Sequence, residues 1–128
     1  MSPARYLALD VGDRRIGLAV GDAGGGIARP LRTLRRRSLE ADVAAIGDIA
    51  RREEVTALVI GLPLTLRGDP GPQAARVRRF ADACGPLGLP VTLHDERFTT
   101  AEAARLGARD VDAGAAAILL EEFLSSRT

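Results

Sequence analysis

The sequence contains no lysine and no tryptophan, and among its 128 residues it has one cysteine and one histidine. A single cysteine, Cys84, excludes an internal disulfide and fits a reducing compartment. One histidine and one cysteine are also too few for a zinc site made of these residue types. No stretch reaches the ~18 apolar residues of a membrane-spanning helix, and the first residues lack the apolar core of a signal peptide. We therefore expect a cytoplasmic protein.

Aromatic residues make up only 3% of the chain, whereas hydrophobic residues make up 46%, so Ala, Leu, Val and Ile must build the core. A chain of this length corresponds to one domain, residues 1–128, which buries roughly two-thirds of its unfolded surface. All 18 cationic side chains are arginine, and the formal net charge is +1. Arginine binds phosphate bidentately, but coding bias also explains this composition, and the balanced charge does not single out nucleic acid.

Hydrophobic periodicity predicts three strands followed by alternating helices and strands. The predicted strands cover 4–11, 16–21, 27–34, 56–61 and 90–94, and the predicted helices cover about 38–52, 72–84, a short segment from Thr99 and a final segment from about 112. Pro30 indicates that the third strand lies at a sheet edge. Strands joined by hairpins pair antiparallel, and strands joined by right-handed crossover helices pair parallel. This order of elements therefore predicts an α/β fold. We expect a five-stranded mixed sheet with helices on both faces, which is the ribonuclease H-like plan.

Asp10 ends an otherwise apolar strand. A carboxylate there is costly to bury unless it is paired or binds a metal ion. The carboxyl ends of parallel strands are also where α/β proteins bind ligands. The alternative is that Asp10 only opens the Asp-Val-Gly-Asp turn.

A second acidic cluster, Asp95, Glu96 and Arg97, follows the last predicted strand. If that strand is parallel to the first, the cluster lies at the same sheet end as Asp10. The intervening strand ends near Gly61, which would leave space above it. Strands two apart are roughly 9.6 Å apart, so side chains that lean inward could flank one or two cations. The alternative is a solvated loop with an ion pair.

Asp112 has two interpretations. Aspartate is a good N-cap, and a cap alone would explain it at the start of the last helix. It could also face a metal ion from that position, with Gly114 and Ala115 allowing the helix to approach the sheet closely. Oxygen ligands favour Mg²⁺ or Mn²⁺ over zinc. His94 lies in a strand and Cys84 on an apolar helix stripe, so we expect both to be structural.

Four arginines lie in segments that could border the proposed carboxylates. They are Arg14 and Arg15 in the first hairpin, Arg67 in the loop after the fourth predicted strand, and Arg97 after the last. They could hold phosphates of a nucleic acid, or they could be solvated surface residues. The loops around them contain no stacking aromatics, so recognition of single strands by base stacking is not favoured. A GxxxxGK[ST] phosphate loop is absent.

The chain resembles the RuvX/YqgF family of Holliday junction resolvases and ribosomal-RNA-processing nucleases. The resemblance rests on ALDVGDRRIGLAVGD, ARPL, VIGLPL, RFA, LHDERFTTAEA and VDAGAAAILLEEFL, which occur in the family's order over nearly the whole chain. The HDER segment followed by TTAEA is quite specific, whereas the first motif is shared with actin-like ATPases. The resemblance implies that Asp10, Glu96 and Asp112 match the family's three acidic positions, and that Asp95 and Arg97 complete its DER motif.

Two departures from the family pattern stand out. Between TTAEA and VDAGAA the family has a longer stretch with Gly and Lys, whereas here only ARLGARD intervenes, so the segment 104–111 is short. Ala113 and Gly114 stand where the family commonly has Ser and a small residue. If the longer stretch contacts nucleic acid in the family, this chain holds its substrate differently.

The first hypothesis is a metal-dependent endonuclease in which Asp10, Glu96 and Asp112 are catalytic and hold Mg²⁺ or Mn²⁺. Arg97 and the loop arginines would hold flanking phosphates, and Asp95 would support the ligands from behind. The substrate would be Holliday junction DNA, which a homodimer would suit, or the precursor of small-subunit ribosomal RNA. The alternatives are a non-catalytic nucleic-acid-binding module and an actin-like nucleotide-binding half, although the latter needs a second half.

Overall fold

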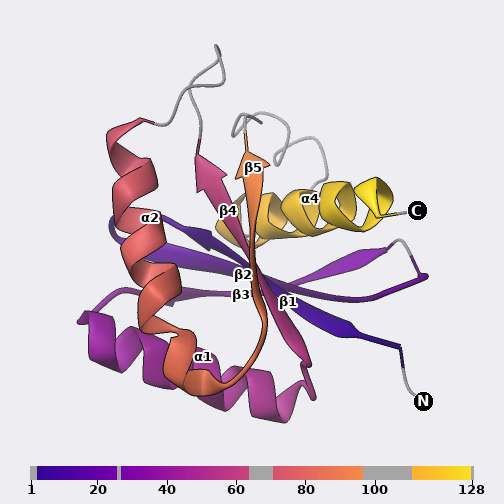
Figure 1. Ribbon diagram of the computed structural model, residues 1–128, viewed down its shortest axis with the longest axis horizontal. Helices are drawn as coiled ribbons and strands as arrows, with labels where there is room; N and C mark the ends of the chain where they lie inside the picture. Colours follow the sequence, from indigo (N-terminus) through magenta and orange to yellow (C-terminus); the bar gives the residue numbers. More distant parts are fainter. Residues whose placement is uncertain (1–2, 26, 64–70, 97–110, 128) are drawn as a thin grey trace.

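The computed structural model describes residues 3–25, 27–63, 71–96 and 111–127. The elements, shown in Figure 1, are β1 (Arg5–Val11), β2 (Arg15–Asp22), β3 (Ala28–Arg35), α1 (Leu39–Arg52), β4 (Ala57–Pro63), α2 (Pro72–Ala83), η1 (Gly85–Leu87), β5 (Val91–Glu96) and α4 (Val111–Ser126). The short helix predicted from Thr99 falls outside the described residues. The other predicted elements are present, with ends that differ by up to two residues.

The strands form one five-stranded sheet in the order β3-β2-β1-β4-β5. The first three strands pair antiparallel, whereas β1, β4 and β5 are parallel neighbours. This confirms the predicted mixed sheet and the edge position of Pro30. Since β1, β3, β4 and β5 run the same way, they all end at one side of the sheet, which we call the carboxyl edge.

Helices cover both faces of the sheet, with α1 and α2 on one face and α4 on the other (Figure 1). Strand β1 serves both layers because its side chains alternate. Leu7 and Leu9 lie in the core beneath α1 and α2, and Tyr6 and Ala8 lie in the core beneath α4. The sheet therefore separates two cores. Odd-numbered residues of β1 face α1 and α2, and even-numbered residues face α4.

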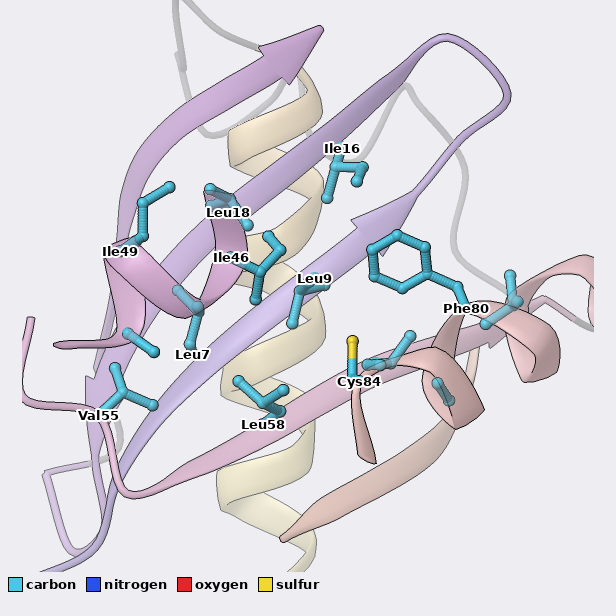
Figure 2. Packing of buried hydrophobic residues seen from close by; sticks show 14 of the residues in the cluster. Leu7, Leu9, Ile16, Leu18, Ile46, Ile49, Val55, Leu58, Phe80 and Cys84 are labelled. Carbon is cyan, nitrogen blue, oxygen red and sulfur yellow. The ribbon is translucent and has the colours of Figure 1, made fainter. Parts of the chain in front are cut away.

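The larger core is aliphatic, as the scarcity of aromatics requires. Figure 2 shows Leu7 and Leu9 of β1 with Ile46 of α1, beside Phe80 and Cys84 of the α2 region. Cys84 is fully buried, which confirms its structural role, and burial raises the pKa of its thiol to about 11.

Local sequence signals explain where α1 lies. The hydroxyl of Ser38 accepts a hydrogen bond from the Ala41 backbone N–H at 3.1 Å, so Ser38 is the N-cap as predicted. Glu40 and Asp42 lie in the first turn and arginines in the last, which suits the helix dipole. Helix α4 is different, because it is rich in buried Ala and Leu on most of its sides. No helix of the described residues is long and apolar enough to cross a membrane.

Two predicted placements were wrong in detail. Strand β5 continues to Glu96, so Asp95 and Glu96 are strand residues and not part of a loop after the strand. Asp112 lies inside the first turn of α4, because Val111 is already helical, so it is not the N-cap. Both corrections matter for the site, since a strand and a helix fix side-chain directions more tightly than a loop does.

Candidate active site

Asp10 stands at the carboxyl edge of β1 on the face that α4 covers, as the alternation with Tyr6 and Ala8 requires. It is part-buried among these apolar neighbours. Desolvation by burial raises the pKa of Asp10 to about 6, and the negative charge of Asp112 contributes to the rise. The structure thus brings these two carboxylates together, although they lie at opposite ends of the sequence.

Gly17 makes this approach of Asp10 and Asp112 sterically possible. In the β1–β2 ladder Gly17 is the direct partner of Asp10. A Cβ atom on Gly17 would stand 1.9 Å from the carbonyl oxygen of Asp112 and 2.3 Å from its carbonyl carbon. The first turn of α4 therefore lies against the bare backbone of β2, directly beside Asp10.

Gly17 was not among the predicted site residues, and the close helix approach was expected to depend on Gly114 and Ala115. The helix does approach closely, but the space that the approach needs is in the strand. A signal was present: a glycine inside a strand often marks a point where another backbone comes near. Gly17 lies inside the strand predicted over 16–21, so this signal applied to it.

Arg15 contacts the same carboxylate from the start of β2. Its Nε donates a hydrogen bond to Oδ2 of Asp112 at 2.8 Å. The structure places its guanidinium on a candidate metal ligand, and the phosphate contact expected of Arg15 stays a prediction. The side chain remains 63% exposed, so it can also be reached from solvent. Its contact fixes the direction in which Asp112 points.

Glu96 belongs to the same face of the sheet. Two residues before it, His94 makes an edge-to-face contact with Phe123 of α4, with ring centroids 5.9 Å apart. Strand β4 lies between β5 and β1, and a Cβ on Gly61 would stand 3.7 Å from the Cβ of Glu96. The Oε2 atom of Glu96 is buried. Glu96 therefore extends over β4, the strand next to Asp10.

The space above Gly61 is not open as predicted. A side chain of Leu119 fills it, with its Cδ2 3.2 Å from the position of a Gly61 Cβ. Among the described residues, no three acidic, histidine or cysteine side chains form a ready-made metal cluster. The structure thus pairs Asp10 with Asp112 and places Glu96 nearby on the same face.

Of the four remaining predicted residues, the structure describes Asp95 and Arg14. Asp95 is exposed and, by strand alternation, lies on the opposite face of β5 from Glu96, so the structure does not bring it to the carboxylates. Arg14 is exposed in the β1–β2 hairpin at the carboxyl edge. Arg67 and Arg97 lie outside the described residues.

The residues present fit a hard divalent cation. Asp10 and Asp112 offer only oxygen atoms, which Mg²⁺ and Mn²⁺ prefer. Their mutual repulsion is part of the reason why the pKa of Asp10 is raised, and a cation beside both would reverse that effect. The pair could therefore hold a metal ion at the carboxyl edge, with Glu96 as a further oxygen donor.

Comparisons with known proteins identify the family of this chain. The model of a family described as "RuvX: Holliday junction resolvase" matches residues 4–126. A relative from Roseiflexus sp. (strain RS-1), named "Putative pre-16S rRNA nuclease", is 43% identical over 137 residues, covering 98% of this chain and 96% of the relative. A relative of the same name from Moorella thermoacetica is 48% identical over 124 residues, covering 96% of this chain and 80% of the relative.

The fold has a solved counterpart. The structure of T. thermophilus RuvC in complex with a Holliday junction substrate matches with a TM-score of 0.65 and 18% identity, over 97% of this chain and 95% of that one. At this identity the match bears on the fold, which it confirms as ribonuclease H-like. The alignment with the Roseiflexus relative is longer than this 128-residue chain, so that relative carries residues that this chain lacks.

Proposed function

Because this chain belongs to the RuvX family, we propose that it is a divalent-metal-dependent nuclease that hydrolyses phosphodiester bonds in structured nucleic acid. The observation that supports this most directly is the approach of Asp10 and Asp112 at the carboxyl edge, where burial and mutual repulsion raise the pKa of Asp10. Two repelling carboxylates in a part-buried position weaken the fold, so a requirement for both charges in function explains their presence.

The protein's own groups have distinct roles in this proposal. Asp10 and Asp112 hold the metal ion, and Glu96 supplies a third carboxylate from β5. When bound, Mg²⁺ or Mn²⁺ would provide Lewis-acid stabilisation of the charge that develops on the phosphate. Arg15 is a positioning residue, because its hydrogen bond orients the Asp112 carboxylate. Gly17 keeps the helix terminus close enough for Asp112 to take part.

The favoured substrate is the precursor of 16S ribosomal RNA, because relatives that are 43% and 48% identical over most of this chain carry that name. Four-way DNA junctions are the second candidate, supported by the description of the family model. The two substrates make different demands. A junction needs two symmetric cuts and hence a two-fold dimer, whereas an RNA end needs one site.

A side-by-side cleavage assay tests the proposal. Wild-type protein and the variants Asp10→Asn, Glu96→Gln and Asp112→Asn are incubated with a precursor 16S RNA fragment and with a synthetic four-way DNA junction, in Mn²⁺, Mg²⁺ or EDTA. Asp48→Asn is the matched control, because Asp48 is an exposed carboxylate of α1 that pairs with the exposed Arg51 on the same helix. We expect cleavage of the RNA by the wild type and the control in metal, and none by the three site variants.

Three results would count against this assignment. Cleavage by Asp10→Asn at the wild-type rate would remove the carboxylate pair from the chemistry. Metal-independent binding without cleavage, unaffected by Glu96→Gln, would favour the non-catalytic module. Preferential cutting of the junction, together with a dimeric mass by light scattering, would replace the ribosomal RNA precursor by branched DNA.

A further inference from the structure

A groove of about 850 Å³ lies at the carboxyl edge, beyond Arg15 on the side of β3. Three segments form it: the β1–β2 hairpin, the end of β3 with the connection to α1, and the first turn of α1. Its lining residues are Asp13, Arg14, Arg15, Thr33, Arg35, Arg36, Arg37, Ser38, Leu39 and Asp42. Half of these side chains are arginines and two are acids, so the groove carries a marked excess of positive charge.

Arg36 stabilises the shape of the groove through its hydrogen bonds. The Nε of Arg36 donates to Oδ2 of Asp42 at 3.1 Å, and its NH1 donates to the carbonyl oxygen of Gly12 at 3.1 Å. Asp42 is only 4% exposed, and its second oxygen accepts the backbone N–H of Arg37 at 3.0 Å. This buried network ties the hairpin, the β3 end and α1 together, so the groove has a fixed shape.

Both acids of the groove are paired, Asp42 with Arg36 and Asp13 with Arg76, but not all of its arginines are. Arg15 is paired with Asp112, and Asp13 accepts from NH1 of Arg76 at 3.0 Å. In the part of the chain that the structure describes, this leaves Arg14, Arg35 and Arg37 without an acidic partner, and all three are exposed. Three uncompensated cations around one hollow repel one another, and a polyanion would relieve that repulsion.

The groove adjoins the carboxylates. In the β2–β3 ladder Arg35 is the direct partner of Arg15, and Arg15 is two residues before Gly17, the ladder partner of Asp10. Two residues of a strand span roughly 7 Å, which is about the rise of two nucleotides. A strand of nucleic acid that lies in the groove can therefore reach Asp10 with the next few nucleotides.

We propose that this groove, which we call the arginine groove, binds the phosphodiester backbone of the substrate and leads it to the carboxylates, an inference that rests on the proposed nuclease function. The described residues that line it include no aromatic side chain, so they offer phosphate contacts and no base stacking. Phosphate contacts position a nucleic acid without reading its sequence. Binding through the groove is thus independent of base sequence and strongly dependent on salt.

The test compares two double variants in metal-free buffer. Arg35→Gln/Arg37→Gln removes two charges from the groove. Arg29→Gln/Arg52→Gln removes two charges away from the groove, near the start of β3 and at the end of α1. Both arginines are exposed, and Arg29 pairs with Glu53. Fluorescence anisotropy measures the affinity for a labelled RNA stem-loop and for a labelled four-way DNA junction between 50 and 200 mM salt. Thermal unfolding checks that each variant folds, and Arg35→Gln alone serves as a milder second variant.

Each phosphate contact contributes roughly 0.7–0.9 to the slope of log affinity against log salt. The slope for the groove variant should therefore be smaller by about 1.4–1.8. Between 50 and 200 mM salt, the loss of affinity should then be roughly 7- to 12-fold smaller for the groove variant than for the wild type. The control variant should keep the wild-type slope. Asp10→Asn should bind like the wild type and fail to cleave.

The outcomes separate this inference from the nuclease proposal. If the groove variant binds with the wild-type slope while the wild type binds and cleaves, only the groove is refuted. Equal losses in the control would also refute it, because binding would then follow diffuse charge. If the wild type binds neither nucleic acid, both proposals fail.

Discussion

The charge of Asp10 should make the metal-free protein less stable, so Asp10→Asn is expected to stabilise it at neutral pH. The pKa of Asp10 is raised from 3.8 to about 6 in the folded chain, first by desolvation and then by Asp112. At ~1.36 kcal/mol per tenfold change in acidity, this rise corresponds to roughly 3 kcal/mol of unfolding free energy. The variant should gain this amount relative to the wild type, because asparagine has no charge to bury.

The direction of the pH dependence follows from proton linkage. Between pH 4 and pH 6 Asp10 is mostly protonated in the folded state and mostly ionised in the unfolded state. The free energy of unfolding of the wild type therefore falls as the pH rises through this range. The free-energy difference between the variant and the wild type should therefore be small below pH 4 and grow to about 3 kcal/mol by pH 7. Comparing the two proteins at each pH cancels the titration of all other groups.

Urea unfolding in EDTA from pH 4 to pH 7.5 measures this difference, with Asp48→Asn as the exposed control, which should show almost no change. Saturating Mn²⁺ should stabilise the wild type but not Asp10→Asn, because a ligand that binds only the folded state adds ~2.7 kcal/mol at a hundred times its Kd. A variant that is less stable than the wild type at pH 7, or a difference that does not vary with pH, would refute the reasoning about the buried carboxylate pair.

Three further outcomes are expected. Gly17→Ala should destabilise the protein by about 3 kcal/mol and abolish cleavage, since its Cβ would clash with the Asp112 backbone; urea unfolding with wild-type stability would contradict this contact. Arg15→Gln should change stability by less than ~1 kcal/mol, because the pair is exposed, yet it should raise the Mn²⁺ concentration needed for half-maximal cleavage; an unchanged requirement would remove its positioning role. Cys84 should react with a thiol reagent only after unfolding, because burial raises its pKa to about 11; rapid labelling of the native protein would show that this part of the core opens.

Alternating and helical patterns predicted most of the fold, because the sheet separates two apolar cores and each strand or helix carries the matching periodicity. Asp10 could be predicted as a candidate site residue for the same reason, since it interrupts an apolar strand. Asp95 and Glu96 could not be separated, because the strand was expected to end before them. Once β5 is known to include both residues, strand alternation alone assigns Glu96 to the face of Asp10.

Features that depend on contacts distant in the sequence were harder to predict. A glycine inside a strand signals that another backbone comes near, but nothing in the sequence around Gly17 shows that the approaching segment is α4. The run Arg35–Arg37 looks like a uniform charged segment in the sequence. In the structure, Arg36 turns to the buried Asp42, whereas its two neighbours remain exposed in the arginine groove.

The contact between Gly17 and Asp112 also orders events during synthesis of the protein. Asp10 emerges from the ribosome in the first strand, but its partner carboxylate arrives only with α4, the last helix that the structure describes. A nascent chain that lacks α4 has the sheet residue without the partner and cannot form the site. Under the proposed function, cleavage would therefore begin only after α4 has docked on the sheet, and chains that end before α4 would be inactive.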